Sequence, residues 1–126
     1  MPTFMWVGIG GFLGANARYF VQLWCANRWG MGFPIGTMVA NVTGAFLLAL
    51  FATLVTEWLN VSQEIRLFVA TGFLGGYTTF SSLGLETWLL LDNRGVWLAI
   101  LNLFGNLILG AGGIVLGVII ARMIVS

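Results

Sequence analysis

The sequence has no histidine and no lysine, and its only charged side chains are five arginines and four acidic residues. Without histidine, the chain lacks the side chain that most often binds metals and moves protons near neutral pH. A net charge of +1 excludes the strongly basic surface with which proteins bind nucleic acid. The single cysteine, Cys25, excludes a disulfide within the chain.

The composition that remains is typical of a membrane protein. Of the 126 residues, 60% are hydrophobic and 7% are charged, whereas a soluble domain carries about a quarter charged residues. A helix that spans a bilayer needs about 20 apolar residues, so four such helices use the whole chain. We therefore expect an all-α membrane protein with a single domain over residues 1–126, too small to enclose a pore alone.

Turn residues and charges divide the chain into four apolar segments. We predict transmembrane helices over about residues 4–25, 35–57, 65–91 and 96–123, with connections over 26–34, 58–64 and 92–95. Every tryptophan lies near a predicted helix end, where an indole ring borders hydrocarbon while its N–H reaches water. The six are Trp6, Trp24, Trp29, Trp58, Trp88 and Trp97.

The arginines outside the predicted helix interiors do not favour one orientation. Four crossings place Arg66 and Arg122 on one side of the membrane, and Arg28 and Arg94 on the other. The positive-inside rule then gives no preference. Either five arginines are too few for the rule to act, or copies of the chain insert both ways and pair antiparallel.

Polar side chains recur at helical spacing inside the predicted helices. They form three stripes: Thr37, Asn41 and Gly44; Asn102 and Asn106; and Thr79, Ser82 and Glu86. Such stripes either hold helices together by hydrogen bonds or line a polar path. Three stripes favour the path. Amide and hydroxyl donors, with the fixed positive charge of Arg18 and few carboxylates, favour an anion over a cation.

The third predicted helix contains an unfavourable stretch over residues 72–82. Two adjacent glycines, Gly75 and Gly76, precede a run of hydroxyl side chains, and both features disfavour a helix. We predict a break there, with a bent but continuous helix as the alternative. A break frees backbone carbonyls, which are hard oxygen ligands suited to a monovalent cation.

Glycines spaced four apart occur on three of the predicted helices and permit close helix contacts. The pairs are Gly10 and Gly14, Gly72 and Gly76, and Gly113 and Gly117. Each pair could serve packing within one chain or a seam between two chains.

Three motifs resemble those of the Fluc (CrcB-type) fluoride channels, over essentially the whole length of the chain. Residues 11–19, GFLGANARY, resemble the family pattern GxxGAxxRY. Residues 36–44, GTMVANVTG, resemble GTxxxNxxG. Residues 72–81, GFLGGYTTFS, resemble GxxGGxTTFS, and Glu86 follows where the family has a glutamate. All three motifs, in order and on the corresponding helices, are highly specific.

The resemblance implies an antiparallel, dual-topology dimer in the cell inner (plasma) membrane, with two pores that passively export fluoride and so prevent its toxicity. It implies no enzyme activity. It places Asn41 and Phe80 in the pore. It also implies a structural sodium ion at the dimer centre, held by the main-chain carbonyls of Gly75 and Thr78 from both protomers.

The candidate residues combine these implications with the polar stripes. The candidate fluoride pathway contains Thr37, Asn41, Thr79, Phe80, Ser81, Ser82, Glu86 and Asn106, and Arg18 is a candidate vestibule or structural residue. Amide and hydroxyl groups can donate hydrogen bonds to fluoride, and the weakly positive edge of an aromatic ring can face an anion.

The sequence departs from the family at two positions. Leu83 stands where the family usually has a second pore phenylalanine, and Asn106 stands where many members have a small hydroxyl residue. Leu83 leaves three outcomes open: one aromatic ring suffices, conduction is slower, or a related partner chain supplies the missing ring in a heterodimer. Asparagine can donate hydrogen bonds as a hydroxyl residue does, so we do not expect Asn106 to abolish transport.

Two other functions fit a small four-helix membrane protein. Small multidrug or cation transporters of dual topology carry a glutamate in the middle of their first helix. The first predicted helix here has Arg18 and no acidic residue, which argues against that function. A purely structural membrane subunit is the second alternative.

Overall fold

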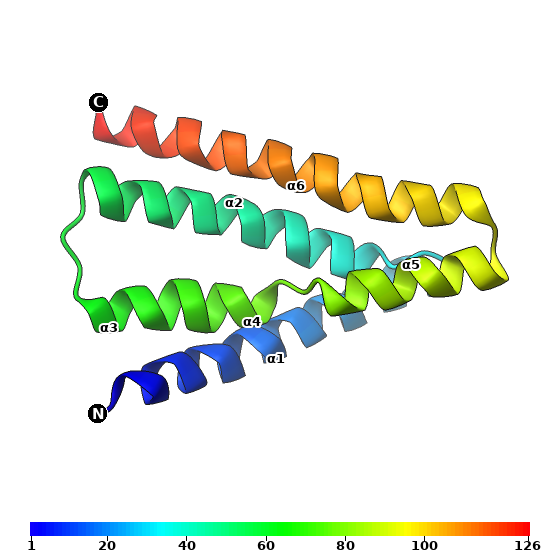
Figure 1. The fold of residues 1–126 in the computed structure, drawn as a ribbon, viewed down its shortest axis with the longest axis horizontal. Coiled ribbons are helices and arrows are strands. Elements are labelled where there is room, and N and C mark those ends of the chain that lie inside the picture. Colours follow the sequence, from blue (N-terminus) through cyan, green and yellow to red (C-terminus); the bar gives the residue numbers. More distant parts are fainter.

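The computed structural model describes residues 1–126 and contains helices but no strands. The elements are α1 (Thr3–Trp29), α2 (Ile35–Glu57), α3 (Gln63–Arg66), the π-helix η1 (Leu67–Leu74), α4 (Gly75–Tyr77), α5 (Ser81–Asn93) and α6 (Val96–Val125). The elements α3, η1 and α4 follow one another without a gap, so they form one continuous helical run (Figure 1). The predicted all-helical fold is confirmed.

The helices lie along a common long direction, and the chain reverses at each connection (Figure 1). Both termini and the α2–α3 connection lie at one end, while the α1–α2 and α5–α6 connections lie at the other. Helices α2 and α6 are long and apolar enough to span a bilayer, with mean hydropathies of 2.1 and 2.3. The architecture therefore has the two polar ends and the apolar middle that a membrane protein needs.

Glycines with positive φ end or precede two of the long helices. Helix α1 continues to Trp29, beyond the expected end near residue 25, because Gly30 is the first residue that leaves the helical conformation. Gly30 has φ 82° and its N–H donates to the carbonyl of Ala26 at 2.8 Å. A glycine readily adopts this conformation at a helix C-terminus. Gly95, with φ 109°, similarly precedes α6.

The third helical segment is broken at residues 78–80, inside the stretch where the sequence predicts a break. Thr78 has an extended backbone, with φ −88° and ψ 156°. Of the two causes that we expected, the glycine pair is wrong, because Gly75 and Gly76 lie inside α4, before the break, whereas the run of hydroxyl side chains begins in the break with Thr78 and Thr79. The π-helical conformation of η1, which widens the helix ahead of the break, has no counterpart in the sequence prediction.

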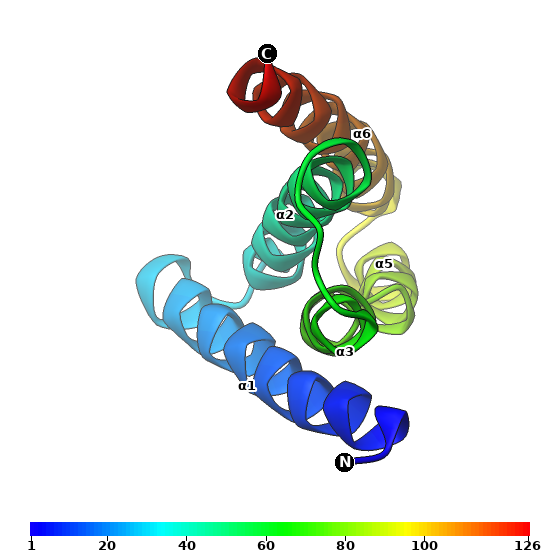
Figure 2. The ribbon, with the colours of Figure 1, turned by 90° about the vertical axis from the view of Figure 1, so that its left-hand side faces the viewer.

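The break lets one segment pack against two different helices. Before it, η1 and α4 pack against α1; after it, α5 packs against α6. Helix α2 contacts both halves and also runs along α6. The end-on view shows α2 in the middle of the structure, with α1 and α6 on opposite sides (Figure 2). The polar residues of α2 therefore lie where all the segments meet.

All three glycine pairs serve close packing within this one chain. Cβ atoms at Gly10 and Gly14 would meet the backbone around Phe73, and one at Gly76 would lie 2.9 Å from the carbonyl oxygen of Gly11. In α6, a Cβ atom at Gly113 would lie 3.1 Å from the carbonyl oxygen of Val42 in α2. The glycines thus bring backbone against backbone between α1 and the third segment, and between α2 and α6.

Most apolar side chains point outward. Only 19 of the 126 residues are buried, and large hydrophobic residues cover the outer face of α6, including Leu107, Ile108 and Val115. A chain with so small a core cannot be stabilised by burial in water, but lipid and other membrane helices can cover this surface.

We predict that Gly14→Ala destabilises the protein by about 1–3 kcal/mol, because the added methyl group would overlap the Phe73 backbone. The midpoint of thermal unfolding in detergent, followed by tryptophan fluorescence, should fall. Gly8→Ala is the matched control on the same helix, since no atom lies within 4 Å of its added methyl group. Equal midpoints for the two variants would contradict the close α1–η1 contact.

Candidate ion pathway

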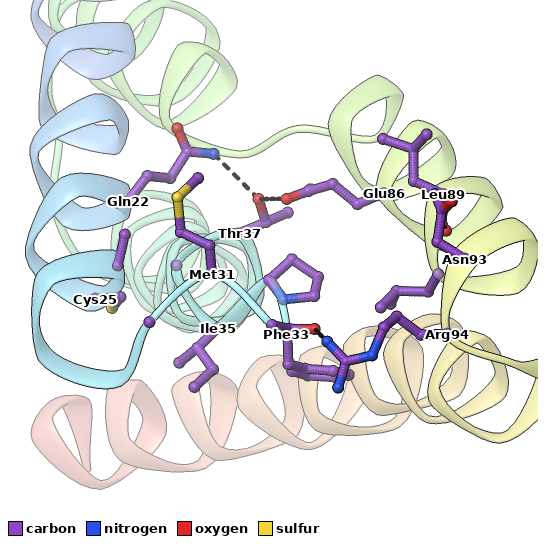
Figure 3. Close-up of a pocket in the computed structure, with 16 residues that line it drawn as sticks. Gln22, Cys25, Met31, Phe33, Ile35, Thr37, Glu86, Leu89, Asn93 and Arg94 are labelled. Atoms are coloured by element: carbon purple, nitrogen blue, oxygen red, sulfur yellow. Dashed lines mark hydrogen bonds between the residues drawn. The ribbon is translucent and has the colours of Figure 1, made fainter.

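Thr37 joins side chains from three helices at the end of the molecule that carries the α1–α2 connection. Gln22 Nε2 of α1 donates to Thr37 Oγ1 at 3.0 Å, and the Thr37 hydroxyl donates to Glu86 Oε2 of α5 at 3.0 Å. Thr37 is 1% exposed, and Glu86 Oε1 is buried without a hydrogen-bond partner. We call these three residues the Thr37 cluster (Figure 3). The unpaired Oε1 leaves this cluster able to accept a further donor.

The Thr37 cluster faces a cavity of about 550 Å³, bordered by the α1–α2 connection and the C-terminal end of α5. Arg94 forms its opposite wall, where Nη1 donates to the carbonyl of Gly32 at 3.2 Å (Figure 3). Glu86 and Arg94 are the two charged side chains that line this cavity. An ion could therefore approach the Thr37 cluster through a space that carries both signs of charge.

One turn further along α2, Asn41 bonds directly to the backbone of the break. Its Oδ1 accepts from the Thr79 N–H at 2.7 Å, and its Nδ2 donates to the Thr79 carbonyl at 3.0 Å. The Asn41 side chain thus supplies the two hydrogen bonds that a neighbouring strand or helical turn would otherwise give to the backbone of Thr79. Two bonds in a ring fix both the position and the orientation of the Asn41 side chain.

The hydrogen bonds of the break free the carbonyls of Gly75 and Thr78. In a continuous helix, the Thr79 N–H would donate to Gly75 and the Ser82 N–H would donate to Thr78. Here the Thr79 N–H donates to Asn41, and the Ser82 N–H donates to Thr79 Oγ1 at 3.2 Å. Two carbonyl oxygens per chain are therefore available to a hard cation, so the residues present fit a sodium ion.

Arg18 supports the same break from the other side. Its Nε donates to the carbonyl of Gly76 at 3.1 Å, across from α1 to α4. In an unbroken helix, that carbonyl would accept the N–H of Phe80. Arg18 thus replaces a lost helical hydrogen bond, so its role at the break is structural. The sequence could not show it, because the two residues lie 58 positions apart.

A line of amides leads from Asn41 into the interface between α6 and α5. Asn41 Nδ2 donates to Asn106 Oδ1 at 2.9 Å, and Asn106 Nδ2 donates to the Asn102 carbonyl at 2.8 Å. Asn102 Nδ2 donates to Thr87 Oγ1 at 3.0 Å. We call Asn41, Asn106, Asn102 and Thr87 the amide line. Asn102 is fully buried and Asn106 is 5% exposed, so the line runs through the interior.

The remaining candidate residues gather around the break. Thr79 Oγ1 lies 3.5 Å from Ser81 Oγ, so these hydroxyls are neighbours, and Ser82 contacts Thr79 through its backbone N–H. A second cavity, of about 540 Å³, is lined by Asn41, Thr79, Phe80, Leu83 and Asn106, among others. Phe80 is 80% exposed, whereas Leu83 is 4% exposed. The two side chains therefore differ in exposure: Phe80 projects from the surface of the chain, and Leu83 packs in its interior.

The candidate residues thus form two groups that meet on α2, where Thr37 and Asn41 lie one turn apart. Three further residues, Gln22, Asn102 and Thr87, belong to these groups although the candidate pathway omitted them. Gln22 lies one turn after Arg18 on α1, and this spacing could have indicated it. Asn102 belongs to the predicted stripe with Asn106, and that stripe was the available signal.

Comparison with known proteins identifies the family. Residues 5–118 match the family described as CrcB-like protein, Camphor Resistance (CrcB). The chain belongs to the CrcB family. It is 43% identical over 122 residues to the fluoride-specific ion channel FluC of a Roseiflexus species, with 94% of this chain and 95% of that protein covered.

Two further CrcB relatives are similarly close. The chain is 42% identical over 118 residues to the fluoride-specific ion channel FluC of Trichormus variabilis, covering 93% of this chain and 86% of the relative. It is 41% identical over 119 residues to that of Solibacter usitatus, covering 94% and 98%. The family resemblance seen in the three sequence motifs is confirmed.

We predict that Asn41→Ala loosens the break in this CrcB protein. The Thr79 N–H and carbonyl would lose their partners, and an unsatisfied buried polar group costs about 1–3 kcal/mol. The midpoint of thermal unfolding should fall, and hydrogen exchange of a peptide spanning the break should become faster. Asn16→Ala is the matched control, because Asn16 bonds only to the Phe12 carbonyl of its own helix. Unchanged exchange at the break would contradict the role of Asn41.

Proposed function

We propose that the chain forms a channel that lets fluoride leave the cytoplasm passively across the cell inner (plasma) membrane and so prevents fluoride toxicity. Relatives that match over 90% of this chain are named fluoride-specific ion channels. The observation in the structure that supports the proposal is the position of Asn41. It carries amide donors at the point where the break, α2 and α6 meet.

The chemistry of the two groups on α2 suits a small anion. Fluoride is strongly hydrated, so its transfer from water is unfavourable unless hydrogen-bond donors replace the lost water. Amide and hydroxyl groups that are able to donate lie along the interior at Asn41, Asn106, Thr79 and Thr37, where they are hydrogen-bonded within the protein. The exposed ring of Phe80 adds a weakly positive edge beside the second cavity. A narrow path of this kind favours fluoride over the larger chloride ion.

We further propose that α1, α2, the broken third segment and α6 each cross the bilayer, and that two copies pair antiparallel. The second cavity is lined partly by Phe80, which is 80% exposed on the single chain. A partner could close this side. Arginines are balanced between the two ends, so neither orientation is favoured. The partner is a second copy of this chain, or a related chain in a heterodimer.

The sodium ion belongs to this antiparallel dimer. The carbonyls of Gly75 and Thr78 are released by the hydrogen bonds that hold the break, and two copies would supply four such oxygens. Carbonyl oxygens can replace the hydration shell of a small monovalent cation. When bound, the ion would link the two breaks at the centre of the dimer.

The proposed function is tested by fluoride efflux from liposomes that contain this chain alone, measured with a fluoride electrode. We expect rapid fluoride efflux and far slower chloride efflux. Comparable rates for the two anions would contradict a fluoride-selective pathway. Proton-coupled ethidium efflux in place of fluoride efflux would favour the small multidrug transporter instead.

Within that assay, we expect Phe80→Ile to reduce fluoride efflux by about fivefold, since it removes an aromatic edge worth about 1 kcal/mol. Leu83→Ile keeps the side-chain volume at a position that is 4% exposed and should have a smaller effect. Equal losses in the two variants would show that Phe80 has no special part in conduction.

We also expect the channel to lose fluoride efflux when sodium is replaced by N-methylglucamine during purification and reconstitution. Without a cation, four carbonyl dipoles would face one another at the proposed dimer centre, which weakens the arrangement of both breaks. Restoring sodium on both sides of the membrane should restore efflux. Full activity in the complete absence of sodium would contradict the proposed ion.

A further inference from the structure

The orientation of every amide in the amide line follows from one backbone group. The Thr79 N–H can only donate, so the atom of Asn41 that faces it is the acceptor Oδ1. The Asn41 Nδ2 group is then directed to the Thr79 carbonyl and to Asn106. Asn106 must meet this donor with an acceptor, and it presents Oδ1 at 2.9 Å.

The same orientation passes along the rest of the line. With its Oδ1 directed to Asn41, Asn106 has Nδ2 directed to the carbonyl and to Oδ1 of Asn102, at 2.8 and 3.2 Å. Asn102 in turn donates to Thr87, whose hydroxyl donates to the carbonyl of Leu83 at 2.7 Å. Every step from Asn41 to Thr87 runs from donor to acceptor in the same order along the amide line.

This arrangement leaves Asn41 with no N–H group for an ion. A side-chain amide has two N–H donors, and those of Asn41 go to the Thr79 carbonyl and to Asn106 Oδ1. The bond to Thr79 is one of a pair that closes a ring, so opening it disturbs both bonds. The bond to Asn106 is single and joins two side chains on different helices. It is the bond that opens at the lowest cost.

We propose that the hydrogen bond between Asn41 and Asn106 is a closed contact that fluoride must open, which makes Asn106 a specificity-determining residue. The inference rests on the proposed function. To occupy the site, fluoride takes the place of Asn106 Oδ1 as the acceptor of the Asn41 N–H. No covalent bond changes, and the neutral contact forms again when the ion leaves.

The contact selects for the strength of the incoming acceptor. A hydrogen bond to an ionised acceptor is about twice as strong as one between neutral groups, so a compact anion such as fluoride can displace the amide oxygen. Chloride spreads the same charge over a larger radius and accepts more weakly. Because it is larger, chloride must also displace the Asn106 side chain further than fluoride does, so opening the contact costs more free energy for chloride and returns less. Asn106 therefore slows every anion but slows fluoride least.

The test compares substitutions at Asn106 in fluoride and chloride efflux from liposomes. Asn106→Ser has a side chain too short to span the 2.9 Å contact, so Asn41 keeps an N–H for the ion. We expect fluoride efflux about fivefold faster, the factor that corresponds to one net hydrogen bond, and a lower ratio of fluoride to chloride efflux. Asn106→Thr, which fills more of the vacated volume, should behave alike.

Asn106→Asp should strengthen the contact with Asn41, whereas Asn106→Ser and Asn106→Thr remove it. The side chain keeps its shape and Oδ1, but a carboxylate would hold the Asn41 N–H more strongly and repel the anion, and it would also lose the donor to Asn102. We expect fluoride efflux to fall by about tenfold or more, as for a charge-assisted hydrogen bond. A purely structural part for Asn106 predicts loss of efflux in all three variants with no change in anion ratio.

Asn16→Ser serves as the control, because its amide bonds only within α1 and lies outside both groups. The absence of fluoride efflux from the unmodified chain would overturn the proposed function. Efflux from the unmodified chain with no gain in Asn106→Ser and Asn106→Thr would overturn only this inference. Faster and less selective efflux in these two variants, with Asn16→Ser unchanged, would support it.

Discussion

The pair of hydrogen bonds between the Asn41 side chain and the Thr79 backbone is the interaction on which the rest of the structure depends. It satisfies the N–H and the carbonyl of an interrupted helix inside an apolar bundle, where water cannot do so. With that requirement met, the third segment can leave α1 and continue against α6. The same bonds release the carbonyls that fit a cation and fix the direction of the amide line.

Close backbone packing is the second constraint, and it explains why the break lies where it does. Glycines of α1 and of the η1–α4 run approach one another so closely that added Cβ atoms would meet backbone atoms. This packing holds Gly76 in the helix against Gly11 of α1, although an interior glycine costs about 1 kcal/mol relative to alanine. The interruption moves to residues 78–80, where Arg18 and Asn41 supply the missing hydrogen-bond partners.

The sequence predicted what depends on periodicity and missed what depends on contacts between distant residues. Helical spacing indicated that Thr37, Asn41 and Asn106 face inward, because polar groups in lipid must find partners. One of the two local reasons for expecting the break was wrong, since the glycine pair precedes it and only the run of hydroxyl side chains coincides with it. Neither the widened turns of η1 nor the bond from Arg18 to Gly76 leaves a local signal, since both arise from packing between α1 and the third segment.

A bundle in lipid must satisfy its buried amides when no ion is present, because an unpaired amide is costly there. The amide line meets this need by directing each side-chain amide nitrogen to an acceptor of the protein itself. In the proposed channel, the same hydrogen bonds decide which solute can enter, since an ion gains a donor only by displacing a protein acceptor. One set of hydrogen bonds would therefore determine both the stability of the empty pathway and its selectivity. A substitution that removes one of these bonds should alter both properties.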